Sequence, residues 1–383
     1  MTSVAGPPPH AIVVGAGIAG CAAAISLAHQ QIPTTLVAAP PPPHPPIGET
    51  LPAAARPLLR DLGAWTAFAR APHRPAPGTV SVWASADPVA IDALHDRNGP
   101  GWQLDRRRFE ADLLETALAA GVTLLPATLV RHVSRRPDLT WELHTDRTPS
   151  TLPLPRLPAR LLVDATGRRA TPARALGARR HTDDRLVCAY LRVPPPPDAP
   201  RPEAASLDAR TWVESVPDGW WYTALPPDGH RVVAFLTDAD LIAPPDSPPD
   251  SPPVTQAFFE KLEATQHLRR LVPPLREPSL AVPRLTSAAT ARLSAFHGND
   301  WIAVGDAALS FDPLSSQGML TALYTGLRGG QALAAHARGD PSALTAYADR
   351  IHRIRDAYLR HRHDAYRSEP RWPTAPFWSR RQP

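Results

Sequence analysis

A glycine-rich turn near the N-terminus places the strongest constraint on the fold of this chain. The apolar residues 11–14 predict a buried parallel strand, and the alanine-rich residues 21–29 predict a helix. Three glycines, Gly15, Gly17 and Gly20, stand between the two, and a second strand is predicted soon after the helix. A glycine turn that joins a strand to a helix inside a β-α-β unit is typical of dinucleotide-binding domains.

Each glycine of this turn has its own task in a dinucleotide site. Gly15 permits the tight turn, Gly17 lets the backbone approach a pyrophosphate, and Gly20 allows the helix to pack closely on the strand. The first turn of the helix, with Ile18 and Ala19, directs free N–H groups and the positive end of the helix dipole at the phosphates. We therefore predict that these five residues bind a dinucleotide. The alternative is a glycine turn in an α/β protein without a ligand.

The acidic residue that usually binds the adenosine ribose is missing from its normal place. It normally ends the second strand of the unit, where this chain has Ala38 and Ala39. The contact with the ribose therefore has to come from elsewhere, and the sequence does not identify it.

A second segment, close to residue 305, predicts the other end of the same site. Residues 301–304 predict a buried strand that Gly305 and Asp306 follow, and a helix is predicted over residues 318–337. Asp306 can accept hydrogen bonds from ribityl hydroxyls, and the amides that open the helix can stabilise the negative charge of a reduced flavin. Together the two segments predict one FAD site. We assign its distal ligands to Gly305, Asp306, Pro313, Ser316, Gln317 and Gly318. A plain helix N-cap on Ser315 or Ser316 is the alternative for this helix start.

Six short motifs carry a resemblance to a known group of flavoproteins. They are Gly48-Glu49-Thr50-Leu51-Pro52, Leu104-Asp105-Arg106, Asp164-Ala165-Thr166-Gly167, Gly219-Trp220-Trp221-Tyr222, Thr237-Asp238-Ala239-Asp240 and Asp312-Pro313-Leu314-Ser315-Ser316-Gln317-Gly318. With them, residues 11–335 resemble the glutathione-reductase-like flavoprotein hydroxylases, in the branch that holds the flavin-dependent halogenases and their monooxygenase relatives. The likeness is greatest to the flavoproteins that modify tryptophan in the quinone-cofactor precursors of bacterial amine dehydrogenases and amino-acid oxidases.

The resemblance implies further residues of the FAD site. In that family the arginine after the aspartate of the second motif contacts FAD, which implies this role for Arg106. Glu49 and Thr50 are implied to lie near the flavin, and Asp164 and Gly167 belong to a strand that passes the cofactor. Two alternatives stay open: Arg106 as a solvated surface arginine, and Asp164 as the plain end of a strand.

The fold that we predict is α/β, with a Rossmann-type FAD-binding domain and an antiparallel-sheet substrate domain, as in flavoprotein hydroxylases. Polar and apolar residues alternate in several runs between residues 185 and 238, which favours an antiparallel sheet. We expect the FAD-binding domain to comprise residues 1–78, 101–184 and 280–340. The substrate domain would comprise residues 79–100 and 185–279, and residues 341–383 would form a C-terminal helical tail.

Two departures from the halogenase pattern favour a monooxygenase. The resemblance implies that a halogenase carries a lysine some thirty residues beyond the Gly-Glu motif, but the single lysine of this chain is Lys261. An arginine cannot replace it, because a guanidinium stays protonated and is a poor nucleophile. Halogenases also carry a Trp-X-Trp-X-Ile-Pro motif, which the residues Gly219 to Pro226 do not match.

The resemblance then implies the chemistry of a flavoprotein hydroxylase. NAD(P)H reduces the FAD, O2 forms a C4a-hydroperoxide, and an electron-rich aromatic ring receives the oxygen atom. That ring belongs to a small aromatic molecule or to a tryptophan of a partner protein. Trp220, Trp221 and Tyr222 are predicted walls of the substrate pocket, with packing between sheet and domain as the alternative. No catalytic residue is identified, and no separate NAD(P)H-binding unit is present in the sequence. A geranylgeranyl-reductase-like FAD oxidoreductase and a non-catalytic flavin-binding partner protein remain as other readings.

Composition excludes several other classes of function. The 41 basic residues against 36 acidic ones are spread along the chain, which argues against binding to nucleic acid. The two cysteines, Cys21 and Cys188, have no metal-ligand spacing, so we expect neither a metal nor a disulfide framework. The N-terminal apolar run is too short to span a membrane and lacks the charged start of a signal peptide. We therefore expect a cytoplasmic protein without a membrane partner.

Overall fold

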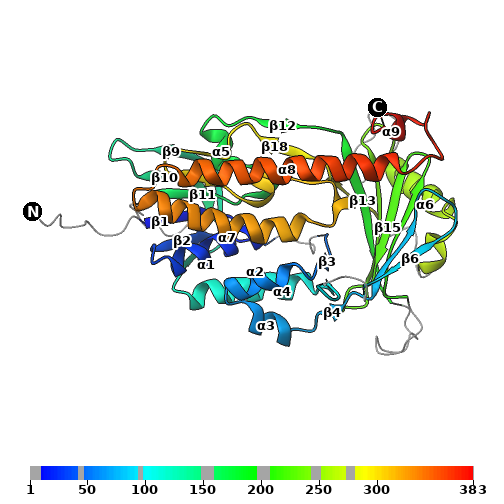
Figure 1. Ribbon diagram of the computed structural model, residues 1–383, viewed down its shortest axis with the longest axis horizontal. Helices are drawn as coiled ribbons and strands as arrows, with labels where there is room; N and C mark the ends of the chain where they lie inside the picture. The colour runs from blue at the N-terminus through cyan, green and yellow to red at the C-terminus, as the bar shows by residue number, and fades with distance from the viewer. Residues whose placement is uncertain are drawn as a thin grey trace, which may run out of the picture.

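The computed structural model describes residues 10–41, 47–93, 98–147, 159–195, 208–242, 252–272 and 281–382. These residues form two lobes that lie one after the other along the long axis of the molecule (Figure 1). The first lobe holds the predicted Rossmann-type unit, and the second is a large, mainly antiparallel sheet. The predicted α/β fold class is confirmed.

A six-stranded sheet in the order β19-β20-β11-β1-β2-β8 forms the centre of the first lobe. Its strands are β1 (His10–Val14), β2 (Thr34–Val37), β8 (Thr123–Leu125), β11 (Ala159–Asp164), β19 (His297–Gly298) and β20 (Trp301–Ala303). All neighbouring strands are parallel except β19 and β20. Both faces of β1 and β2 are covered, which explains their continuous apolar sequence.

Close packing of two helices, α1 (Ile18–His29) and α7 (Gly318–Ala337), unites the distant ends of the chain. Glycines on α7 make this possible. A Cβ atom on Gly326 would lie 2.4 Å from the carbonyl oxygen of Ala19, and one on Gly330 would lie 2.8 Å from that of Ala23. Because the helices approach so closely, the start of α7 is held beside the glycine turn that precedes α1.

The second lobe is built on a seven-stranded sheet in the order β17-β13-β16-β15-β14-β5-β6. Its strands are β5 (Gly78–Val82), β6 (Val89–Asp92), β13 (Leu186–Val193), β14 (Thr211–Val216), β15 (Gly219–Ala224), β16 (Arg231–Asp238) and β17 (Arg284–Ser287). Neighbours are antiparallel except β14 and β5. Helix α6 (Pro252–Glu263) covers one face, where Phe258 packs on Trp221.

The C-terminal residues lie across both lobes. Helix α8 (Ala343–Arg367) starts beside the first sheet, where the Tyr347 hydroxyl donates a hydrogen bond of 2.9 Å to the carbonyl oxygen of Ala303. It ends at the second lobe, next to the short helix α9 (Pro376–Ser379) (Figure 1). Trp378 of α9 is buried, with its ring centroid 5.3 Å from that of Trp83. The tail therefore ties the two lobes together.

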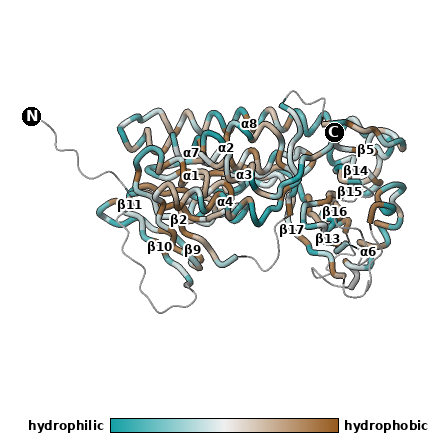
Figure 2. Tube along the Cα trace, turned by 90° about the horizontal axis from the view of Figure 1, so that it is seen from below, coloured by the Kyte–Doolittle hydropathy of each residue, from teal (hydrophilic) through white to brown (hydrophobic). Residues whose placement is uncertain are grey.

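Smaller elements complete the described part of the fold. They are helices α2 (Ala55–Asp61), α3 (Trp65–Arg70), α4 (Arg106–Ala119) and α5 (Thr171–Ala175), and strands β3 (Thr50–Leu51), β4 (Arg74–Pro75), β7 (Trp102–Gln103), β9 (Thr128–Arg135), β10 (Trp141–Arg147), β12 (Arg180–Thr182), β18 (Ala291–Leu293) and β21 (Leu309–Ser310). The hydrophobic segments gather in the interior of the lobes (Figure 2). Among the described residues, no helix combines the length and apolar character needed to cross a membrane.

Candidate active site

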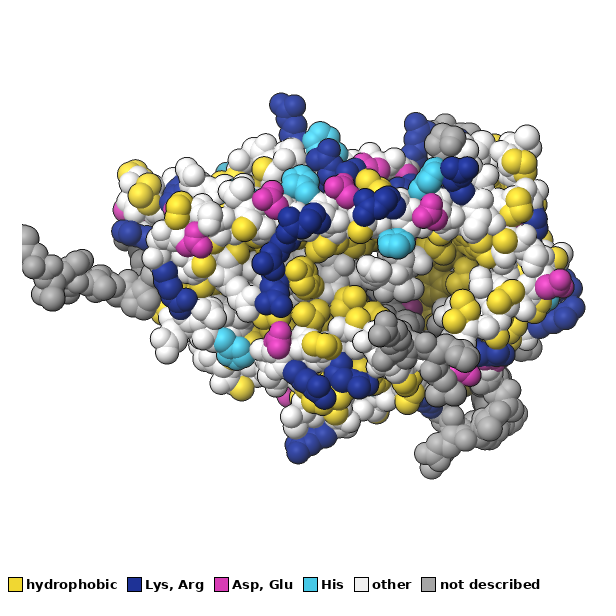
Figure 3. All heavy atoms as spheres, in the orientation of Figure 1, with side chains coloured by type: hydrophobic (Ala, Val, Ile, Leu, Met, Phe, Trp, Pro, Cys, Tyr) yellow, Lys and Arg dark blue, Asp and Glu magenta, His cyan; other side chains and the backbone are white. Residues whose placement is uncertain are grey.

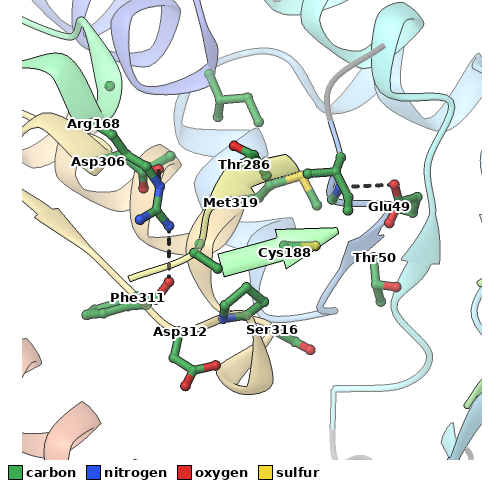
Figure 4. Close-up of a pocket in the computed structure, with 18 of the residues that line it drawn as sticks. Glu49, Thr50, Arg168, Cys188, Thr286, Asp306, Phe311, Asp312, Ser316 and Met319 are labelled. Carbon is green, nitrogen blue, oxygen red and sulfur yellow. Dashed lines mark hydrogen bonds and ion pairs between the residues drawn. The ribbon is translucent and has the colours of Figure 1, made fainter. Parts of the chain in front are cut away.

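The two lobes enclose a cavity of about 420 Å³, which is visible as a hollow with hydrophobic side chains in Figure 3 and in close-up in Figure 4. The first lobe contributes the starts of α1 and α7, and the second contributes residues of β13, β14, β15 and β17. The predicted residues that line it are Gly17, Ile18, Ala19, Glu49, Thr50, Arg106, Gly167, Trp220, Tyr222, Asp306, Pro313, Ser316 and Gly318. Those that do not line it are Gly15, Gly20, Asp164, Trp221, Gly305 and Gln317.

The glycine turn before α1 has the geometry that the fingerprint requires. A Cβ atom on Gly15 would lie 2.3 Å from the carbonyl oxygen of Ala165, and one on Gly20 would lie 1.7 Å from that of Gly15. These two glycines therefore let the turn, the helix and β11 come together. A Cβ atom on Gly17 would meet no atom within 4 Å, because Gly17 faces the open cavity.

The start of α7 mirrors this arrangement on the other side of the cavity. A Cβ atom on Gly318 would also meet no atom within 4 Å. Gly305 has a φ of +58°, and a Cβ atom on it would lie 2.6 Å from that of Ala19, so this glycine brings the distal segment against α1. Gln317 is exposed and lies outside the cavity wall.

Two arginines lie in the wall of the first lobe. Arg106 donates a hydrogen bond of 3.2 Å to the carbonyl oxygen of Gly48 and forms an ion pair of 2.8 Å with Glu110, one turn further along α4. The Nε atom of Arg168 lies 3.5 Å from a carboxylate oxygen of Asp306 (Figure 4). Glu110 and Arg168 also line the cavity, and the sequence analysis assigned neither of them a role. The i, i+4 spacing between an arginine and a glutamate was the available signal for Glu110.

Both carboxylate oxygens of Asp164 accept hydrogen bonds inside the first lobe. One of its oxygens accepts hydrogen bonds from the backbone N–H and the hydroxyl of Thr166, at 2.9 and 2.7 Å. The other accepts one of 2.9 Å from the backbone N–H of Ala173. The Asp164 side chain therefore fixes the loop between β11 and α5, while Gly167 of that loop reaches the cavity.

Strand β15 presents two of its three predicted aromatic residues to the cavity. Trp220 and Tyr222 point to one face of the sheet, and Trp221 points to the other because side chains alternate along a strand. Trp221 is fully buried and stacks on Phe235 with ring centroids 4.6 Å apart. The prediction that Trp221 lines the substrate pocket is therefore wrong, and the packing alternative holds for this residue.

A buried carboxyl group, Glu49, lies between the two lobes at this wall. Its Oε1 accepts a hydrogen bond of 3.0 Å from the Gly48 backbone, and its Oε2 accepts one of 3.3 Å from the Tyr222 hydroxyl. Burial raises the pKa of Glu49, and the hydrogen bonds and the charges of Arg192 and Arg106 oppose that rise. Burial and the nearby Glu49 likewise hold the pKa of Tyr222 well above its ordinary value.

A second buried carboxyl group, Asp312, lies in the turn that leads into α7. One oxygen accepts a hydrogen bond of 2.9 Å from the backbone of Leu314, and the other accepts one of 2.7 Å from the Tyr366 hydroxyl. Burial raises its pKa, and these two bonds oppose the rise. Asp312 belongs to a sequence motif but has no role predicted from it, and no sequence pattern indicates Tyr366.

The residues present fit the predicted cofactor. The N-terminal ends of α1 and α7 both open into the cavity, at Gly17 and Gly318, and neither first turn contains an acidic residue. Each end therefore offers backbone N–H groups and a positive dipole to an electron-rich group. FAD carries an anionic pyrophosphate and, separated from it by the ribityl chain, a flavin ring, and these two groups match two such helix ends that share one cavity.

Comparisons with known proteins agree with this geometry. The model of a family described as FAD binding domain matches residues 10–361. The putative FAD-dependent oxidoreductase LodB of Marinomonas mediterranea is 28% identical over 379 residues, which are 97% of this chain and 96% of LodB. Both matches extend over nearly the whole chain.

Several solved structures are similar over 98% of this chain, among them a dihydroxylase and a halogenase. The peptidyl tryptophan dihydroxylase QhpG, described as essential for tryptophylquinone cofactor biogenesis, has a TM-score of 0.79 at 26% identity, with 79% of QhpG covered. The myxobacterial chondrochloren halogenase CndH has a TM-score of 0.82 at 21% identity, with 86% of CndH covered. The likeness to the halogenase is one of fold.

Proposed function

Because this chain belongs to the family of proteins with an FAD-binding domain and is an FAD-dependent oxidoreductase, we propose that it is a monooxygenase that hydroxylates an electron-rich aromatic ring. One observation carries the proposal. The cavity that both helix N-termini enter is walled on its other side by the aromatic side chains of Trp220 and Tyr222. A cofactor and an aromatic ring can therefore share one space.

The two sides of the cavity divide the work of binding FAD. Gly17, Ile18 and Ala19 would hold the pyrophosphate, and Asp306 the ribityl hydroxyls. The start of α7, with Pro313, Ser316 and Gly318, would face the pyrimidine edge, with Thr50, Arg106 and Gly167 on the surrounding wall. Bound FAD supplies the activation of O2, after reduction by NAD(P)H.

The chain itself has to exclude water and accept a proton. The mostly apolar wall of the cavity serves the first task. Hydroxylation replaces a ring hydrogen, so a proton has to leave the ring carbon. We propose Glu49 as the acceptor of this proton, because Glu49 lines the cavity beside Tyr222 and burial raises the pKa of its carboxyl.

The substrate that we propose is a tryptophan side chain of a partner protein, with a small aromatic molecule as the alternative. QhpG, at 26% identity over nearly the whole chain, is a peptidyl tryptophan dihydroxylase, which supports the first choice. An indole ring matches a wall that is itself built from an indole and a phenol.

Halogenation is the second candidate, and the position of Lys261 argues against it. This residue lies on α6, where its ammonium group pairs with Asp218 and lies 5.7 Å from the centre of the Phe235 ring. Phe235 packs with Trp221 on the sheet face that is turned away from the cavity, and Lys261 is not among the residues that line the cavity. The only lysine of the chain therefore cannot deliver an oxidised halogen to a ring beside Tyr222.

The experiment that tests the proposal has two steps. The purified chain is first titrated with FAD, and we expect flavin fluorescence to be quenched as FAD binds, less so in Asp306→Ala. NADH or NADPH and O2 are then supplied with tryptophan-containing peptides, with bromide present in parallel samples. A mass gain of oxygen on the peptide supports the proposal. Absence of FAD binding or a brominated product would contradict it.

A further inference from the structure

Three buried side chains form a hydrogen-bonded chain across the junction of the two lobes. The indole N–H of Trp220 donates to the Tyr366 hydroxyl at 3.1 Å, and that hydroxyl donates to Oδ2 of Asp312 at 2.7 Å. All three residues are about 1% exposed. Trp220 and Asp312, the first and last residues of this hydrogen-bonded series, line the cavity, and Tyr366 between them does not.

Each residue of this chain comes from a different part of the fold. Trp220 lies on β15 of the second sheet, Asp312 in the turn before α7, and Tyr366 at the end of α8 (Figure 1). In the close-up of Figure 4, Asp312 lies beside Ser316 at the start of α7. The tail thus supplies the group that joins the aromatic wall to the turn that faces the expected flavin edge.

The hydroxyl of Tyr366 satisfies two buried polar groups at once. The Trp220 N–H has no other hydrogen bond among the described residues. Oδ1 of Asp312 is occupied by the Leu314 backbone, and Oδ2 lies 3.9 Å from Nε of Arg362, beyond hydrogen-bonding distance. Loss of the hydroxyl would therefore leave the Trp220 N–H without a hydrogen bond, and it would leave Oδ2 of Asp312 with only its ion pair of 3.9 Å to Arg362.

We propose that Tyr366 is a positioning residue that holds the Trp220 wall and the Asp312 turn at a fixed separation, so that ring and flavin meet correctly. The inference rests on the proposed function, because it assumes that FAD and an aromatic ring occupy the cavity together. The C-terminal tail thereby takes part in both binding events although Tyr366 does not line the cavity.

Tyr347 provides a matched control on the same helix. It is also buried, and its hydroxyl makes one hydrogen bond of 2.9 Å, to the carbonyl oxygen of Ala303 in β20. It does not line the cavity. Tyr347→Phe therefore removes a buried hydroxyl bond from α8 without breaking the link between the two walls.

The test compares wild type, Tyr366→Phe and Tyr347→Phe. FAD binding is measured by fluorescence, and indole is then titrated as a probe while the absorbance of the bound flavin is recorded. We expect Tyr366→Phe to raise the Kd for both FAD and indole about tenfold, and Tyr347→Phe to change each less than about twofold. Equal behaviour of the two variants would overturn the inference and leave the proposed function intact. A wild-type chain without FAD binding would overturn both.

A second variant tests the same link from its other end. Trp220→Phe keeps a ring in the wall and removes the N–H, with Trp141→Phe as the control, since the Trp141 N–H donates to the Arg160 carbonyl at 2.9 Å in the first lobe. In the Trp220→Phe background, Tyr366→Phe should add less than about twofold to the Kd for indole, because their bond is already lost. If the effects of the two substitutions on the Kd for indole were fully additive, this would contradict an energetic link between Trp220 and Tyr366. If Tyr366→Phe does not fold, Trp220→Phe against Trp141→Phe decides by the Kd for FAD, since Trp220 is not among the residues assigned to FAD: a selective rise in that Kd supports the inference, and its absence overturns it.

Discussion

The carbonyl oxygen of Gly15 lies 1.7 Å from the position that a Cβ atom on Gly20 would occupy. Backbone stands on both sides of this contact, so no side chain can move away to relieve a clash. The glycine at position 20 is therefore required by the packing of the turn on α1, before any ligand is considered.

A pair of alanine substitutions separates this packing role from ligand binding. Gly20→Ala should destabilise the fold by about 3 kcal/mol or prevent folding, because overpacking cannot be relieved. Gly17→Ala should fold normally, since Gly17 has an extended backbone with φ of −77° and open space at its Cβ position. It should nevertheless weaken FAD binding about tenfold or more, because the new methyl group enters the cavity. Thermal melting without FAD and fluorescence titration with FAD measure the two effects; normal FAD affinity in Gly17→Ala would count against a pyrophosphate at this turn.

Substitutions of two neighbouring aromatic residues of β15 should affect the binding of indole to different extents. Trp221→Phe keeps the stacking on Phe235 and removes an indole N–H that has no hydrogen-bond partner in the described structure. It should change stability by less than about 2 kcal/mol and leave the Kd for indole unchanged. Tyr222→Leu removes a ring from the cavity wall and should raise that Kd about fivefold or more. Flavin difference spectra with indole give both values, and a larger effect at Trp221 than at Tyr222 would refute the assignment of faces.

The buried Glu49 predicts a pH dependence of stability. Its pKa in the folded chain is raised above the ordinary value of 4.5, so the folded chain binds this proton more tightly than the unfolded chain. The contribution of Glu49 is therefore full below pH 4.5 and falls as the pH rises through its raised pKa. The melting temperature of Glu49→Gln, measured relative to that of wild type at the same pH, should rise as the pH is taken from below 4.5 to neutral. Glu115→Gln, on the exposed side of α4, serves as the control, and a difference between Glu49→Gln and wild type that stays constant with pH would disprove the burial argument.

Lys261 should be dispensable both for the stability of the fold and for oxygenation of the peptide. Its ion pair with Asp218 is partly exposed, and such pairs contribute about 0–1 kcal/mol. Lys261→Met should therefore melt close to wild type and retain NAD(P)H-driven oxygenation of the peptide. Loss of product formation at unchanged stability and FAD content would contradict this prediction and favour a role for Lys261 like that of the lysine in halogenases.

Local patterns predicted the framework of the first lobe. The apolar run before Gly15, the alanine-rich helix after it, and the helix over residues 318–337 appear in the structure as β1, α1 and α7. Each depends on neighbours in sequence, where periodicity is informative. The hairpin of β9 and β10 was not predicted, because its charged residues Arg131, Arg135 and Asp146 obscure the strand pattern.

The cavity wall was predictable where a motif or an alternation marks it. The period of two along a strand already separates Trp221 from Trp220 and Tyr222, and that signal was available in the sequence. Tyr366 had no such signal. It meets Asp312 through the path of α8 across both lobes, and no local spacing connects residues 54 positions apart.

The close packing of α1 on α7 also sets an order of events during synthesis. Gly17 leaves the ribosome roughly three hundred residues before Gly318, on the order of 15–60 s at about 5–20 residues per second. During that interval α1, which is buried from Ile18 to Leu27 in the finished fold, has no partner for the face that α7 will cover. The nascent chain therefore exposes an apolar helix that a chaperone can recognise. Cofactor loading has to wait until α7 has been synthesised.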